Sequence, residues 1–140
     1  MLYLYVFGDN IEDRFGHWRY FLFYFLSGFA ASMFFILTDM ESSIPAIGAS
    51  GAISGVLGAY LVLYPKARVL TLVILGWITI VPIPAILLLG FWFIFQLFYG
   101  MLAFGSQAVT SIAYWSHIGG FIAGLLFGLA WRSRRSKRDF

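Results

Sequence analysis

The chain contains no cysteine among its 140 residues and little charge, with only 11% of residues charged. The absence of cysteine excludes disulfides, thiolate nucleophiles and cysteine-ligated metals. This low charge content and a hydrophobic content of 61% both argue against a soluble domain. A soluble domain of this length would leave large apolar patches in water. The composition therefore predicts a membrane protein.

The charge that is present is unevenly distributed. The net charge is +3, and basic residues gather at the C-terminus: Arg132, Arg134, Arg135, Lys137 and Arg138. They directly follow an apolar segment, so the tail at 132–140 is expected to lie at a membrane surface rather than on nucleic acid. Residues 1–131 are expected to form one membrane domain.

Long apolar runs predict an all-α bundle with four full membrane helices, each of about 20 residues. The expected spans are Trp18–Leu37, Pro45–Tyr64, Pro84–Met101 and Trp115–Trp131. The segment 69–83 between them is interrupted by prolines and is too short to cross, so it is expected to be an amphipathic or half-span segment. All nine basic residues then fall on one side. The positive-inside rule makes that side, with the C-terminus, cytoplasmic.

The N-terminus predicts an incomplete helix. Leu2–Phe7 is apolar but reaches only about 9 Å as a helix. The polar stretch GDNIEDRFGHWR follows and is expected to be a cytoplasmic loop, with Asp9, Asn10, Glu12 and Asp13 as a loop and helix-capping cluster. We therefore expect an N-terminally truncated bundle that begins inside a membrane helix.

Two stripes of glycines indicate closely packed helices. One stripe is Gly51, Gly55 and Gly58, and the other is Gly120, Gly124 and Gly128. Such stripes permit close backbone approach in membranes, and packing is their commonest role. Ser50 adjoins the first stripe, and His117 lies three residues before the second. Because both helices are expected to descend from the outer face, their contact would bring Ser50 and His117 together.

A serine and a histidine at one depth are suited to nucleophilic chemistry. A hydroxyl becomes reactive when a base accepts its proton, and neutral imidazole does so near pH 7. Gly48 and Gly51 leave the backbone around Ser50 open. The helix N-terminus there offers N–H groups of Ser50 and Gly51 to an oxyanion.

Other polar residues are weaker candidates. Gln96 is expected to form an interhelical hydrogen bond, and His17 is expected to be a solvated loop histidine. The sequence shows no spacing that requires a metal, and it contains no phosphate-binding or dinucleotide motif. We expect no metal and no cofactor.

The stretches GASGAISG and SHIGGFIAGLLFG, in this order, resemble the rhomboid family of intramembrane serine proteases, and the bacterial-type members in particular. The resemblance extends to about Trp131. It implies that Ser50 is the nucleophile and His117 the general base, with no acidic third member. It also implies a helix bundle with a water-filled cavity, and an enzyme that cleaves transmembrane proteins. The family's first membrane helix and the start of its second would precede Met1.

Two functions stay open at this point. One is a rhomboid-type endopeptidase, and the other is an inactive pseudoprotease or truncated fragment that binds membrane helices. A transporter subunit is disfavoured, because Ser50 and His117 are expected near the outer face rather than at the midplane. The expected partners are transmembrane protein substrates and the bilayer of a bacterial inner or plasma membrane, without nucleic acid. The sequence leaves the oligomeric state open.

Overall fold

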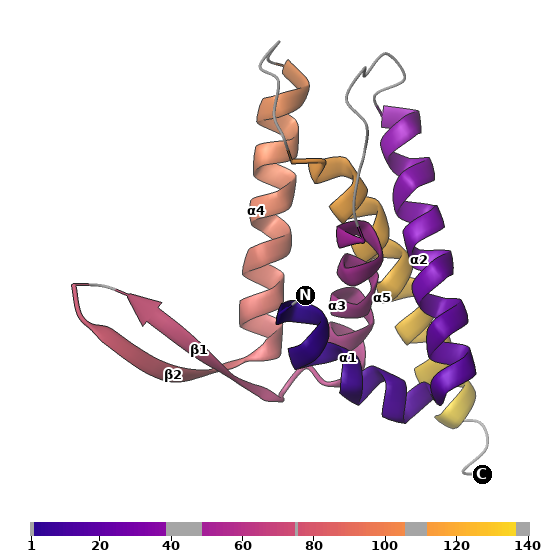
Figure 1. Ribbon diagram of the computed structural model, residues 1–140, viewed down its shortest axis with the longest axis horizontal. Helices are drawn as coiled ribbons and strands as arrows, with labels where there is room; N and C mark the ends of the chain where they lie inside the picture. The colour runs from indigo at the N-terminus through magenta and orange to yellow at the C-terminus, as the bar shows by residue number, and fades with distance from the viewer. Residues whose placement is uncertain (1, 39–48, 75, 106–111, 137–140) are drawn as a thin grey trace.

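The computed structural model describes residues 2–38, 49–74, 76–105 and 112–136. Its elements are α1 (Leu2–Phe15), α2 (His17–Thr38), α3 (Ser50–Leu63), β1 (Arg68–Ile74), β2 (Ile78–Pro84), α4 (Ala85–Gly105) and α5 (Tyr114–Ser136). Helices α2 to α5 stand side by side with α3 among them, α1 crosses their lower end, and the two strands project sideways (Figure 1).

Helices α3 and α5 are in backbone contact along two glycine stripes. A Cβ added at Gly120 would meet the carbonyl oxygen of Gly51, and one added at Gly124 would meet that of Gly55. Gly51 and Gly55 of α3 meet Gly120 and Gly124 of α5 in the same order along the chain. The two helices therefore run parallel. Both helices therefore begin at the same end of the bundle (Figure 1).

Helix α2 packs against this pair through small residues and aromatic rings. A Cβ added at Gly55 would lie 2.5 Å from Cβ of Ser27 on α2. At the lower end, the ring of Phe23 lies 4.7 Å from that of Phe127 on α5. The close upper packing and the aromatic lower packing hold α2, α3 and α5 as one unit.

Helix α1 corrects the expected N-terminal loop. The helix continues to Phe15, so the expected loop residues are all helical: Asp9, Asn10, Glu12 and Asp13. The reason is the spacing of the apolar residues. Phe7, Ile11 and Phe15 recur every four residues and are buried at 2%, 0% and 3% exposure. The acidic residues occupy the other faces of the same helix.

The segment 68–84 also differs from expectation, because it forms an antiparallel β-hairpin rather than a half-span helix. Leu72 pairs with Ile80 in its register. Its many β-branched residues favour strands, and Gly76 takes a positive φ of 79° in the turn. The prolines are tolerated because each strand of a two-stranded sheet has a free edge. The fold is therefore mainly helical rather than all-α.

Among the described residues, two helices are long and apolar enough to cross a membrane, namely His17–Thr38 and Ala85–Ala103. The structure thus supports two of the four predicted full spans. Helix α3 has only 14 residues, and the predicted extension through Pro45 falls outside the described residues. Helix α5 continues into the basic tail and ends at Ser136.

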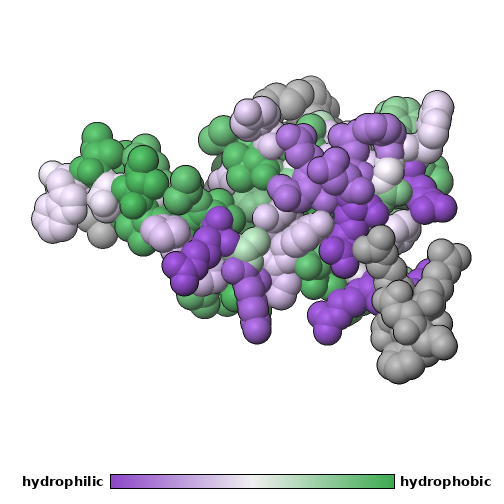
Figure 2. Space-filling view, turned by 90° about the horizontal axis from the view of Figure 1, so that it is seen from below, coloured by the Kyte–Doolittle hydropathy of each residue, from purple (hydrophilic) through white to green (hydrophobic). Residues whose placement is uncertain are grey.

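The basic residues of the described chain lie at the lower end of the bundle. The guanidinium of Arg14 lies 5.3 Å from the ring centre of Tyr64, at the end of α3. That of Arg19 lies 5.6 Å from the ring of Trp131 on α5. Seen from below, hydrophilic residues gather over this end, whereas the projecting hairpin is mostly hydrophobic (Figure 2).

The glycine contact predicts a large difference between two alanine substitutions. Gly124→Ala should destabilise the protein by about 1–3 kcal/mol, because its methyl group would force α5 away from the backbone of Gly55. Gly90→Ala is the matched control, since no atom lies within 4 Å of a Cβ there. Unfolding in detergent micelles measures both. Equal stability of the two variants would contradict the proposed contact.

Candidate functional site

Ser50 is the first residue of α3, where it is exposed. The preceding residue, Ala49, is the N-cap and makes no side-chain cap hydrogen bond. The N–H group of Ile53 donates to the Ala49 carbonyl at 2.9 Å, which begins the helical ladder. The alanine at the N-cap position therefore supplies no side-chain cap to the N–H groups of the first turn. Gly48 falls outside the described residues.

His117 lies in the first turn of α5, half-buried between α4 and α5. Its Nδ1–H donates to Oε1 of Gln96 on α4, with an N···O distance of 2.9 Å. Gln96 thus makes the interhelical bond expected of it, and its side chain is buried at 7% exposure. In a neutral imidazole that carries its proton on Nδ1, the other nitrogen, Nε2, is a proton acceptor.

An aromatic residue of α4 lies beside the histidine, and sequence reasoning missed it. The ring centre of Trp92 lies 6.0 Å from that of His117. Phe93 stacks on Phe121 of α5 at 4.5 Å. Trp92 and Gln96 are four residues apart, so they share a face of α4. That spacing is the signal that could have identified Trp92 as a neighbour of the histidine.

The residues next to Ser50 and His117 are in contact. A Cβ added at Gly51 would lie 2.7 Å from Oγ of Ser116. Ser50 and His117 are therefore each one residue away from a point where α3 and α5 are in contact. The hydrogen bond that the His117 ring makes runs to Gln96, however, and the pairing of His117 with Ser50 stays a prediction. Ser54 donates its hydroxyl to the Ser50 carbonyl at 2.8 Å, so it is satisfied within α3.

A pocket of about 330 Å³ opens beside the start of α3. Ala49 and Gly51, the neighbours of Ser50, line it together with Ser116 of α5. The remaining lining comes from α2 and α3 and combines aromatic rings with small residues: Tyr24, Phe25, Gly28, Phe29, Ser32 and Ala52. The pocket can therefore receive apolar groups beside a helix N-terminus.

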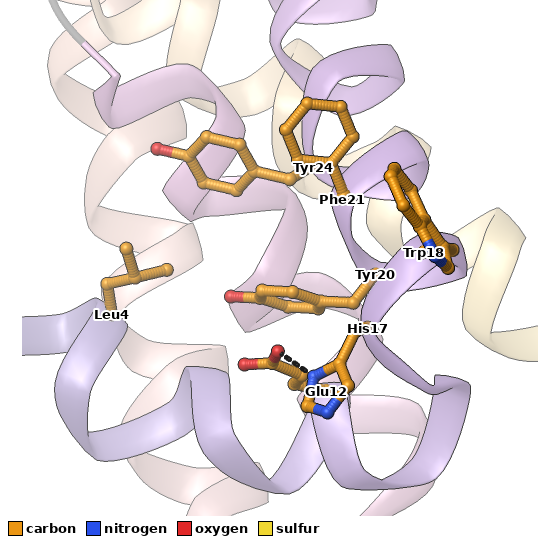
Figure 3. A pocket seen from close by; sticks show the side chains of 7 residues that line it. All are labelled: Leu4, Glu12, His17, Trp18, Tyr20, Phe21 and Tyr24. Atoms are coloured by element: carbon orange, nitrogen blue, oxygen red, sulfur yellow. Dashed lines mark hydrogen bonds and ion pairs between the residues drawn. The ribbon is translucent and has the colours of Figure 1, made fainter.

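A second pocket, of about 400 Å³, lies between α1 and α2 at the other end of the bundle. Figure 3 shows Tyr20 and Tyr24 directed into the gap above the pair of Glu12 and His17. The Nδ1 atom of His17 lies 2.5 Å from Oε1 of Glu12, and the His17 side chain is 89% exposed. His17 is thus solvated, although it begins α2 rather than lying in a loop. It does not approach Ser50.

The described residues offer no cluster of metal ligands. Within the ranges that the structure describes, no group of three or more potential metal-binding side chains occurs.

Comparison with known proteins gives one family. The model of the Rhomboid domain matches residues 1–134. The chain is 32% identical over 133 residues to mitochondrial Rhomboid protein 1 of Saccharomyces cerevisiae, covering 91% of this chain and 35% of that protein. It is 35% identical over 123 residues to mitochondrial RHOMBOID-like protein 6 of Arabidopsis thaliana, covering 88% of this chain and 34% of that protein. No solved structure matches the chain significantly.

These relatives bear on how much of a rhomboid protein this chain represents and on the expected bacterial membrane. The chain spans about a third of their length, 35% and 34% for the two relatives. Both are eukaryotic and are described as mitochondrial, so they do not support a bacterial membrane or a bacterial-type member. With that origin unsupported, a cytoplasmic location for the C-terminus also stays a prediction.

The bond between His117 and Gln96 predicts measurable coupling. Unfolding of Gln96→Leu, His117→Phe and the double variant should give a coupling energy of about 1 kcal/mol, within the range for membrane hydrogen bonds. Thr71→Val is the control partner, because its hydroxyl donates locally, to the Val69 carbonyl. Thr71→Val should add to His117→Phe without coupling. Additivity in both cycles would show that the bond does not stabilise the protein.

Proposed function

Because the chain belongs to the rhomboid family, we propose that it is an intramembrane serine endopeptidase with Ser50 as nucleophile and His117 as general base. The observation that carries the proposal is the hydrogen bond from His117 Nδ1 to Gln96 Oε1, at 2.9 Å. It favours the tautomer whose Nε2 can accept a proton. His117 directly follows Ser116, and Ser116 contacts Gly51, the residue after Ser50.

The proposed reaction begins when Ser50 Oγ attacks the carbonyl carbon of the scissile peptide bond. His117 Nε2 accepts the hydroxyl proton and then gives it to the leaving amine, which forms an acyl-enzyme. Water, activated by the same histidine, hydrolyses that ester. The backbone N–H groups of Ser50 and Gly51 at the start of α3, together with that of Gly48, are proposed to stabilise the oxyanion.

The substrates are proposed to be transmembrane proteins. The pocket beside Ala49 and Gly51 is lined mostly by apolar groups, and it opens on the exposed face of α2. An apolar segment arriving from the bilayer could enter it without crossing a polar surface. Its peptide bond would then lie next to the uncapped first turn of α3.

One observation favours a second candidate function. The His117 ring bonds to Gln96, and the described residues show no hydrogen bond between it and Ser50. A pseudoprotease that captures membrane helices without cutting them would need no such bond. Catalytic hydrogen bonds can also tighten only when substrate binds, so the two candidates separate by activity. Capture of a transmembrane substrate with no cleaved product would favour the pseudoprotease.

The dyad predicts selective labelling by a serine-directed phosphonate. The wild-type protein should be labelled at Ser50, and Ser50→Ala should lose the label. His117→Ala should be labelled at least about 10²-fold more slowly, because general base catalysis contributes 10²–10⁴. Ser32→Ala is the control, because its exposed hydroxyl lines the same pocket but donates within α2 to Gly28. Equal labelling of the wild type and Ser50→Ala, read by mass spectrometry, would reject the dyad.

Gln96 is proposed to be a positioning residue. Gln96→Leu removes the acceptor for Nδ1–H, so the phosphonate reaction should slow by roughly tenfold, less than the loss from removing the base itself. Gln96→Glu keeps an acceptor oxygen and should restore most of the rate. Its negative charge should also shift the pH–rate profile toward higher pH. A residue with only a packing role would give the same loss in both variants and no shift of the profile.

A further inference from the structure

The β-hairpin carries an apolar face that is turned away from the protein. Beyond the pair of Arg68 and Pro84 at its base, the cross-strand pairs on this face are Leu70 with Pro82, Leu72 with Ile80, and Ile74 with Ile78. The exposed fractions are 74% for Leu70, 57% for Leu72, 68% for Ile74, 71% for Ile78 and 64% for Ile80. We call these six residues the apolar hairpin face. They include no polar side chain.

The opposite face of the hairpin is less exposed but more polar. It carries Thr71 and Thr79 between valines and isoleucine, and most of its side chains are half-buried. In a hairpin exposed to water, the exposed face is normally the polar one. A two-stranded hairpin is also marginally stable alone in water. The apolar hairpin face therefore needs a cover.

The base of the hairpin is attached firmly to the helices. The N–H group of Ala85 donates to the Ala67 carbonyl at 2.8 Å, and that of Ile86 donates to the Pro65 carbonyl at 3.1 Å. These bonds join the start of α4 to the segment before β1. The hairpin consequently projects across the helix direction, at the lower end of the bundle (Figure 1). If the helices cross a bilayer, the hairpin lies along its surface.

Charge and continuity identify the cover as lipid. Lys66 and Arg68 are exposed at the base of the hairpin, at the end of the bundle that carries the other described basic residues. Basic residues at this level meet the phosphates of anionic lipids. The apolar surface also continues from β2 into α4, where Ile86 and Leu87 are 52% and 63% exposed. Trp77, in the turn, is 72% exposed and has the amphipathic ring typical of membrane interfaces.

We propose that the apolar hairpin face inserts into the interfacial layer of the bilayer that the helices cross, with Lys66 and Arg68 at the lipid phosphates. Each seven-residue strand extends about 23 Å along the surface. The hairpin would then widen the contact between the protein and one leaflet. The inference rests on the membrane location of the family and is independent of the chemistry at Ser50.

Spin labels test the proposal directly, because the chain has no cysteine and single cysteines can be labelled uniquely. Leu72→Cys and Ile80→Cys report on the apolar hairpin face. Leu87→Cys on α4 is the lipid-facing control, and Ser133→Cys at the end of α5 is the aqueous control. The proteins are reconstituted in vesicles of phosphatidylcholine and phosphatidylglycerol. Power saturation then compares collisions with oxygen, which concentrates in lipid, and with a nickel chelate, which stays in water.

The labels at positions 72 and 80 should lose most of their nickel collisions relative to position 133 and should resemble position 87. Nickel access equal to that at position 133 would overturn the proposal. Labels shielded from both reagents would also overturn it, and dipolar broadening between labels would then identify a second copy of the chain as the cover.

A second measurement leaves the face itself unchanged. Lipids brominated near the headgroup should quench the fluorescence of Trp77, obtained as the difference between wild type and Trp77→Phe. Lack of quenching in that difference would count against insertion even if a cysteine variant failed to fold.

Discussion

The backbone contact between α3 and α5 is the constraint on which the rest of the molecule depends. The carbonyl oxygens of Gly51 and Gly55 occupy the space that side chains at Gly120 and Gly124 would need. In lipid, apolar side chains gain little by leaving hydrocarbon for a protein interior, so helices associate through close packing. This contact supplies the packing and also sets the register of the two helices. The register is what brings Gly51 against Ser116, next to the two candidate catalytic residues.

Helix α4 is attached to that pair in a different way. Its contacts with α5 include aromatic pairs, through Trp92 and Phe93, and the hydrogen bond between Gln96 and His117. The buried amide of Gln96 and the half-buried imidazole of His117 each need a polar partner, and each supplies the other. The same bond selects which imidazole nitrogen holds the proton. One hydrogen bond therefore both attaches α4 to α5 and sets the tautomer of His117, so a displacement of α4 would alter both.

The features predictable from the sequence were those that depend on spacing along a helix. The glycine stripes suggested two closely packed helices, the predicted topology suggested that both begin at one end, and the isolated glutamine suggested an interhelical bond. Two other segments were misread because hydropathy was considered alone. Polar Asp9 to Asp13 hid the four-residue spacing of Phe7, Ile11 and Phe15. The apolar run at 69–83 has no alternation of polar and apolar residues, although its β-branched residues favour strands. Trp92 was missed because its role depends on which face α4 turns toward α5.

The two ends of the bundle are built differently, and the difference follows from what each end must do. Near Ser50 the chain uses Ala49, Gly51 and Ser116, which leave backbone groups uncapped and a pocket open. Such small residues cannot by themselves hold Ser50 in position. At the other end, large rings pack together, as where Phe15 lies 5.1 Å from Phe127. Because helices are stiff, rigid packing at that end and along the glycine stripes can position the open end from a distance. An accessible serine is thereby compatible with a precise location.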